Sequence, residues 1–303
     1  MRFYHFLPVL LMLNVWQLSF GQPGDSLQTD TIRFTLTSAN NIKVQSVLNG
    51  EDTLNLMLHT ASNSVTLIRS ITDGLKSLTW DSVDSTKSWG GENSARRSSV
   101  NTLSIGAFEW DSVAIWENEH SGPETDGKFG LNFFKEQWIE INFEEELLVI
   151  HPSLPEKANS YEKLAITYER GFVFLRAEIE IGGEEFSHSY LLHSGFGGTV
   201  LFDDEFAAST RLGEALKIFD SSELKDAYGN VLKTNKALLP AMKIGSETIR
   251  EFPVGFFEGA IGRQKMSVMG GEVLKRFNWV LNLEEGCVYI EANKLMGLPF
   301  REG

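Results

Sequence analysis

The sequence contains a single cysteine, Cys287, so no disulfide can form within one chain. Cys287 lies in the strand-like run 286–290, where we expect a buried thiol rather than a nucleophile. Basic residues are also scarce, because 27 Lys and Arg stand against 41 Asp and Glu, giving a formal net charge of −14. Nucleic acids and anionic membrane surfaces are bound by basic patches, so this composition argues against both as partners.

Several short catalytic motifs are also missing from the sequence. It has no Gly-rich phosphate loop, no Cys-x-x-Cys, no His-Glu-x-x-His and no Gly-x-Ser-x-Gly. His193 and Ser194 are adjacent, but neighbouring residues of a strand point to opposite faces. We therefore do not expect this pair to act as a base and its nucleophile.

Long apolar runs are absent except near the N-terminus, where residues 6–20 follow the positively charged Arg2. Ser19 and Gly21 have the spacing of a signal-peptidase site, so residues 1–21 are predicted to be a signal peptide. The run is too short for a stable membrane span. We expect an exported protein, periplasmic or extracellular; the alternative is a buried first helix.

The sequence carries an internal duplication, which is the signature of repeated architecture. The unit at 189–202, an apolar strand, a small-residue turn and a second apolar strand, has a near-copy at 55–67. Residues 129–150 align without gaps on residues 269–290. The markers follow the same order in both halves, which predicts two similar lobes.

Both halves are rich in strand and turn signals, and helical signals are short. The first lobe is predicted at residues 22–151 and the second at 152–303, with a proline-containing connector at 151–161. The clearest predicted elements are strands at 31–36, 42–48 and 171–181, hairpin turns at 49–50 and 182–183, and short helices at 132–137, 203–212 and 272–277.

The order of these markers resembles that of the retropepsin-like aspartic peptidases, in the fused two-lobe form of bacterial secreted proteins. In that family each lobe begins with apolar-apolar-Asp-Thr/Ser-Gly, followed by a flap hairpin, an apolar-apolar-Gly strand, a short helix and a final hairpin. The third marker is matched here by residues 128–130 and 268–270. The resemblance implies an all-β, bilobal pepsin/retropepsin-like acid protease fold with two similar β-barrel lobes and short helices.

The first marker departs from the family at the reactive position, where His59 and His193 stand in place of the two aspartates. Aspartic peptidases need two carboxylates that share one proton, so that one acts as base and the other as acid. Two imidazoles do not reproduce that arrangement, because two facing imidazolium ions repel each other. The resemblance therefore implies a catalytically inactive homologue.

The residues after the two histidines keep more of the family pattern. Thr60 and Ser194 retain the hydroxyl that, in the family, hydrogen-bonds across the lobe interface. Gly195 is retained, whereas Ala61 stands where the first loop should have glycine. The Cβ of alanine removes backbone conformations that glycine allows. This pattern indicates that the scaffold is kept and the chemistry removed.

Two glycine-containing loops fall where the family has its flaps. The first is Trp89-Gly90-Gly91 and the second includes Tyr228-Gly229. An aromatic side chain beside glycine at a hairpin tip can close over an extended ligand. The alternative is that both loops are ordinary exposed turns.

Two imidazoles at close range are also a potential site for Zn²⁺ or Cu²⁺. A tight site requires further ligands, and the sequence names none for His59 and His193. His188 lies an odd number of residues before His193, on the opposite strand face. We expect no cofactor, and the simplest expectation is that both histidines only hydrogen-bond their neighbours.

Three functions follow from these observations. The first is an exported, inactive peptidase homologue that binds a peptide or protein segment in the cleft between the lobes. The second is a hydrolase with non-standard chemistry at His59 and His193, with or without a bound metal. The third is a structural or assembly protein of the cell envelope.

Overall fold

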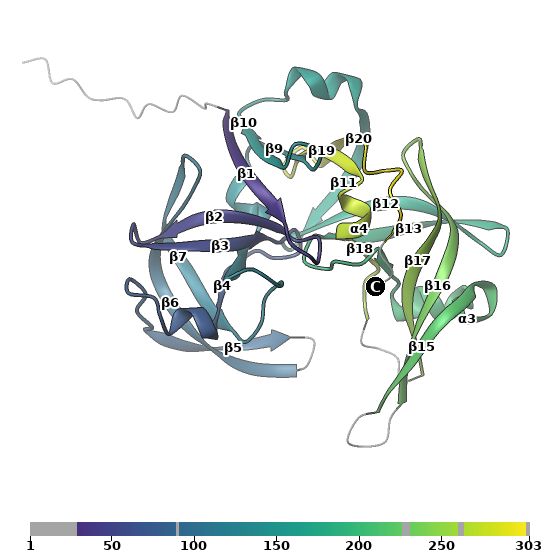
Figure 1. The fold of residues 1–303 in the computed structure, drawn as a ribbon, viewed down its shortest axis with the longest axis horizontal. Helices are drawn as coiled ribbons and strands as arrows, with labels where there is room; N and C mark the ends of the chain where they lie inside the picture. The colour runs from purple at the N-terminus through teal and green to yellow at the C-terminus, as the bar shows by residue number, and fades with distance from the viewer. Residues whose placement is uncertain (1–28, 89–90, 226–230, 260–263, 301–303) are drawn as a thin grey trace, which may run out of the picture.

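The computed structural model describes residues 29–88, 91–225, 231–259 and 264–300, which form 20 strands in two lobes (Figure 1). Lobe one contains β1 (Asp30–Leu36), β2 (Ile42–Leu48), β3 (Asp52–Leu58), β4 (Val65–Ile68), β5 (Ser82–Ser88), β6 (Gly91–Ile105), β7 (Phe108–Asn118), β8 (Gly127–Phe129), β9 (Trp138–Asn142) and β10 (Leu147–His151). Lobe two contains β11 (Glu162–Glu169), β12 (Phe172–Ile181), β13 (Glu184–His193), β14 (Val200–Leu201), β15 (Lys217–Lys225), β16 (Val231–Ile244), β17 (Glu247–Gly259), β18 (Val268–Gly270), β19 (Phe277–Asn282) and β20 (Cys287–Ala292). The predicted signal peptide, residues 1–21, lies outside the described residues.

Each strand of lobe one has its counterpart ten strands later in lobe two. The pairs β2–β3, β3–β8, β4–β7 and β5–β6 recur as β12–β13, β13–β18, β14–β17 and β15–β16, with the same parallel or antiparallel sense. The predicted all-β, bilobal architecture is therefore confirmed.

One antiparallel sheet joins the lobes, in the strand order β1-β10-β9-β19-β20-β11. At its centre Glu140 of β9 pairs with Val280 of β19, and these two residues are equivalent in the internal alignment. An approximate twofold axis consequently passes between them.

Two tight turns have the residue types that their backbone conformations require. Asn49 and Gly50 have φ values of 50° and 68°, and Gly182 and Gly183 have 60° and 84°. Two successive positive φ values are what a two-residue type I′ hairpin requires, and Asn and Gly adopt them at low cost. Both predicted hairpin turns are present between β2 and β3 and between β12 and β13.

The helices are short, as predicted. The predicted helix at 203–212 corresponds to α2, which starts after Asp203, whose carboxylate accepts a hydrogen bond from the N–H of Phe206 at 2.8 Å. No helix in the described ranges has the length and apolar character to cross a membrane. The helical segments are α1 (Arg69–Thr72), η1 (Leu131–Phe134), η2 (Glu156–Ser160), α2 (Asp204–Ser209), α3 (Leu212–Ala215) and α4 (Gly271–Leu274).

The predicted helices at 132–137 and 272–277 are shorter than expected. They correspond to η1 and α4, which end at Phe134 and Leu274. Phe277 is the first residue of β19, and its fully buried ring is committed to the sheet that joins the lobes. Strand pairing therefore outweighs the local helical signal at the end of this segment.

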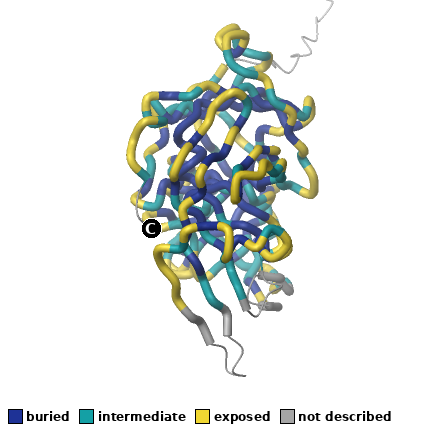
Figure 2. The backbone as a smooth tube through the Cα atoms, turned by 90° about the vertical axis from the view of Figure 1, so that its right-hand side faces the viewer, coloured by how far each residue is buried: buried dark blue, intermediate teal, exposed yellow. Residues whose placement is uncertain are grey.

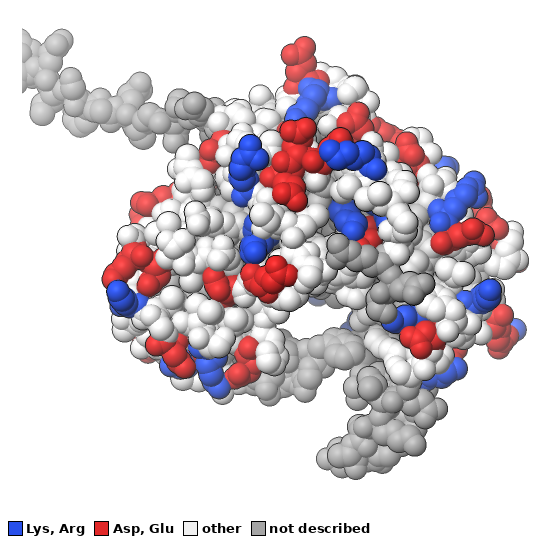
Figure 3. Space-filling model, viewed as in Figure 1, with Lys and Arg blue, Asp and Glu red and all other residues white. Residues whose placement is uncertain are grey.

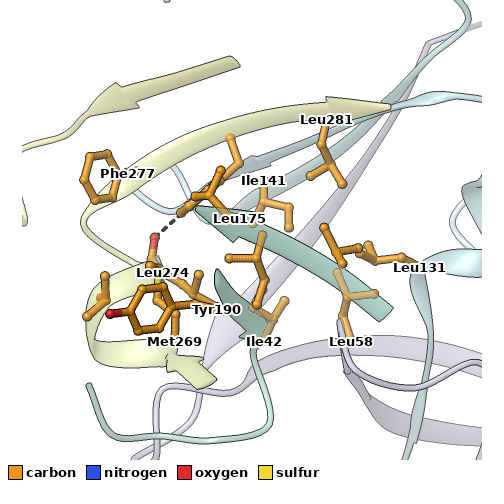
Figure 4. Packing of buried hydrophobic residues seen from close by; sticks show 14 of the residues in the cluster. Ile42, Leu58, Leu131, Ile141, Leu175, Tyr190, Met269, Leu274, Phe277 and Leu281 are labelled. Atoms are coloured by element: carbon orange, nitrogen blue, oxygen red, sulfur yellow. Dashed lines mark hydrogen bonds between the residues drawn. The ribbon is translucent and has the colours of Figure 1, made fainter. Parts of the chain in front are cut away.

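Most buried apolar residues of both lobes form one continuous core, and Trp138, Ala158, Val280 and Cys287 form a second, small cluster (Figure 2). Figure 4 shows residues of both lobes in the continuous core, and Ile42 and Leu131 of lobe one line one small cavity with Leu274 and Leu281 of lobe two. Because this core is shared, each lobe is fixed in position by the other. The loops described below lie at this junction.

Candidate functional site

Two loops meet at the junction of the lobes, one from each lobe. His59 directly follows β3, and its N–H donates to the carbonyl of Phe129 at the end of β8, at 2.8 Å. His193 ends β13 and is paired with Gly270 of the parallel strand β18. Each loop is thus held by a parallel strand pair of its own lobe, which fixes its direction.

Thr60 and Ser194 tie the two loops together. The Thr60 N–H donates to the Ser194 hydroxyl at 3.0 Å, and the Ser194 N–H donates to the Thr60 hydroxyl at 2.9 Å. The Thr60 hydroxyl donates to the carbonyl of Leu192, and the Ser194 hydroxyl donates to that of Leu58, both at 2.6 Å. This reciprocal set leaves both hydroxyls with a donor and an acceptor partner.

The imidazoles of His59 and His193 face each other across the junction. Their ring centroids are 4.7 Å apart, and the ring planes are inclined by 58°. Burial, followed by the effect of His193, holds the pKa of His59 well below its usual range. Burial lowers the pKa of His193 to about 4. Both rings are therefore neutral at pH 7.

The two rings differ in their hydrogen bonds. Nδ1 of His59 accepts a hydrogen bond from the N–H of Ala61 at 3.2 Å, so in the neutral ring the proton is on Nε2. Nδ1 of His193 is buried and has no partner among the described residues. The pair is therefore asymmetric, although its two loops are related by the duplication.

Gly195 and Ala61 contribute to this asymmetry. A Cβ at Gly195 would lie 2.4 Å from Nε2 and 2.5 Å from Cδ2 of His59, so only glycine leaves room for this ring. Lobe one carries Ala61 at the equivalent position. The His59 ring therefore lies over a glycine of the opposite lobe, whereas the equivalent position of lobe one carries a methyl group.

Lys128 is a site residue that the sequence analysis did not identify. The register of β3 and β8 places Lys128 opposite Met57, on the strand face that also carries His59, two residues further along. The next residue, Phe129, points into the core and is fully buried. Burial lowers the pKa of the Lys128 amine. Its positive charge, after burial, also lowers the pKa of both imidazoles.

A signal for Lys128 was present in the duplication, because the equivalent residue of lobe two is Val268. Lysine at one of two equivalent positions, where the other has a buried apolar residue, marks a local change of chemistry. Val268 itself is buried and pairs with Leu191 and Leu201.

His188 belongs to a separate cluster. Its Nε2 lies 3.0 Å from a carboxylate oxygen of Asp203 and 2.9 Å from the hydroxyl of Ser267. Within the described ranges, no three His, Cys, Asp or Glu side chains come together as a metal site would require. A metal at His59 and His193 would therefore find no third His, Cys, Asp or Glu ligand among the described residues.

Two cavities adjoin the loops that carry the histidines. One, of about 480 Å³, is lined by both lobes: residues 38–40 of lobe one face residues 196–200 and 253–255 of lobe two. The other, of about 550 Å³, is lined by residues 63–65 and by aromatic side chains that include Trp110. Each begins within a few residues of one histidine. Figure 3 shows open space between the described parts of the lobes.

The predicted flap loops join strands that form long hairpins in both lobes, β5–β6 and β15–β16 (Figure 1). Gly91 is the first residue of β6 and pairs with Ser88. Trp89, Gly90, Tyr228 and Gly229 lie outside the described residues.

The paired lobes, the joining sheet and the two loops define a bilobal pepsin-like fold. Among solved structures, the chain is similar to the aspartic proteinase from Irpex lacteus, with a TM-score of 0.60 and 12% identity over 90% of this chain and 100% of that one. No family model and no curated protein matches the sequence. At 12% identity the structural similarity shows the fold alone, so the chemistry of this chain depends on the residues of its own site.

Proposed function

We propose that this chain is an exported, catalytically inactive homologue of the retropepsin-like aspartic peptidases, and that it binds a peptide or protein segment between its lobes. The main support for the proposal is that the two loops keep the hydrogen bonds that join the lobes but lack the two aspartates. Thr60 and Ser194 make their full set of hydrogen bonds across the junction, while the residues before them are His59 and His193.

The pKa values of the two imidazoles support inactivity. Peptide hydrolysis at such a site needs a base to activate water and an acid to polarise the carbonyl. Both rings are held neutral by burial, so neither is an imidazolium acid near pH 7. Lys128 is a basic group that acts on both rings, but an ammonium group does not share a proton with either ring as a carboxylate pair would.

The cavities support a binding role. A chain that has lost its chemistry but kept space on each side of the loops can still hold an extended segment. The cavity between the lobes is lined by residues of both halves of the chain, so a bound segment would contact both lobes.

A peptidase assay tests the proposal directly. The natural mature chain and a restored variant carrying His59→Asp, Ala61→Gly and His193→Asp are incubated with an unfolded protein from acid to neutral pH. We expect no cleavage by the natural chain and measurable cleavage by the restored one. Cleavage by the natural chain that His193→Ala abolishes would replace this proposal with the non-standard hydrolase.

The proposal that the protein is exported rests on residues 1–21, which have the pattern of a signal peptide. N-terminal sequencing of the protein recovered from its native cell envelope or medium is expected to begin at Gln22. Recovery of the chain in the cytoplasm with residues 1–21 attached would contradict export. The proposal that a peptide binds between the lobes would still stand.

A further inference from the structure

We propose that the junction of the lobes binds a carboxylate group of the bound segment, through Lys128 and the imidazoles of His59 and His193. This inference rests on the proposed peptide-binding function and names the chemistry that the site recognises. The strand register of β3 and β8 puts Lys128 and His59 on one face, and His193 packs against His59 from the other lobe.

No carboxylate of the described residues pairs with any of these three side chains. The acidic residues that precede Lys128 in the chain are committed elsewhere. Glu124 accepts a hydrogen bond from the N–H of Ser38, and Asp126 accepts one from the N–H of Asn55. The charges that act on the histidine pair are consequently those of basic groups.

An isolated ammonium group that is largely removed from water is unfavourable unless an anion accompanies it. Burial lowers the pKa of the Lys128 amine, which is the expected sign of such a group. A ligand carboxylate would supply the missing counter-charge and accept charge-assisted hydrogen bonds. The Nε2–H of His59 is a further donor, because its Nδ1 is already occupied by the N–H of Ala61.

The local charge is opposite to that of the whole molecule. The chain carries a formal net charge of −14, yet the charged side chain that acts on both histidines is the basic Lys128. A small positive region between low-dielectric walls attracts anions to one place and not to the surface as a whole. This favours recognition of one carboxylate within a segment, rather than general binding of acidic polymers.

Three synthetic peptides distinguish the sources of the carboxylate. All are N-acetylated hexapeptides of one apolar sequence: one with a central Glu and an amidated C-terminus, one with Gln in its place, and one with Gln and a free C-terminal carboxylate. Affinity for the full mature chain is measured by calorimetry, and the imidazole resonances of His59 and His193 are followed by NMR. We expect a carboxylate-bearing peptide to bind roughly 10- to 100-fold more tightly than the neutral one.

Variants assign the preference to Lys128. Lys128→Met should abolish the difference between the Glu and Gln peptides, and Lys128→Arg should keep most of it. Lys243→Met, which removes an exposed lysine paired with Glu178, serves as the matched control and should leave the difference unchanged.

The possible outcomes test carboxylate recognition and peptide binding separately. Equal affinity of the natural chain for all three peptides would overturn carboxylate recognition and leave peptide binding standing. If no peptide binds and neither histidine resonance moves, both the carboxylate site and the peptide-binding function fall. A preference for the internal Glu identifies a side chain as the ligand, and a preference for the free terminus identifies the end of a chain.

Discussion

The hydroxyl of Thr60 and the hydroxyl of Ser194 each accept a hydrogen bond from the backbone N–H of the other residue. Both residues are buried, with 5% and 1% of their surface exposed, so water cannot replace either partner. These bonds join loops that are 134 residues apart in the chain. The two loops are therefore held together by two small side chains.

Thr60→Val should lower the free energy of unfolding by about 2–4 kcal/mol. The substitution keeps the shape but leaves the N–H of Ser194 and the carbonyl of Leu192 buried without a partner, and each unsatisfied group costs about 1–3 kcal/mol. Denaturant unfolding measures the change. Thr35→Val, at an exposed position of β1, is the control and should change stability by less than about 0.5 kcal/mol. A similar effect of both substitutions would show that the hydroxyl is not needed.

The positions of these loops were predictable from the sequence because the duplication fixes both copies at once. The strands before His59 and His193 are apolar on successive residues, as strands buried on both faces should be. The pairing of Glu140 with Val280 was not predictable, since nothing local specifies which strand of one lobe meets the other. The role of Lys128 was not predictable from its segment, because residues 128–130 match a fold marker and the direction of the Lys128 side chain depends on the register of β8 with Met57.

Acid should destabilise the protein through His193. Its pKa is about 4 when folded, against an ordinary value of 6.5, so between these pH values the unfolded chain binds a proton that the folded chain does not. The contribution of His193 to stability is therefore fully present above about pH 6.5 and is lost as the pH approaches 4, a change of about 3 kcal/mol. Unfolding free energies measured from pH 7.5 to 4 should show a flatter profile for His193→Gln. An equal slope in His193→Gln and in the natural chain would contradict this assignment, and exposed His120→Gln is the control.

Asn40 links the lobes through its side chain. Its amide nitrogen donates to the carbonyl of Gly197 at 2.9 Å and to the carboxylate of Glu272 at 3.0 Å, and its amide oxygen accepts from Lys275 at 3.0 Å. Asn40 has a φ of 58°, a conformation that glycine adopts freely, so Asn40→Gly removes the hydrogen bonds without backbone strain.

Asn40→Gly is therefore expected to lower the free energy of unfolding by about 2 kcal/mol. The matched control is Arg170→Gly, at an exposed position with a φ of 53°, which should be neutral. Thermal and denaturant unfolding of both variants provide the comparison. If the two substitutions have the same effect, the hydrogen bonds of Asn40 add nothing to the docking of the lobes.

Gly195→Ala tests the position of the His59 ring. The new Cβ would lie 2.4 Å from Nε2 of His59, so the ring must move, and overpacking of this kind costs about 1–3 kcal/mol. In a His59→Ala background the obstacle is gone, and the same substitution should cost much less. Comparing the two backgrounds gives a coupling energy for this one contact. Gly74→Ala, whose Cβ would meet nothing closer than 3.5 Å, controls for the general effect of replacing glycine. If Gly195→Ala is tolerated in the natural chain as well as Gly74→Ala, the ring does not lie over Gly195, and the asymmetry between the two histidines needs another cause.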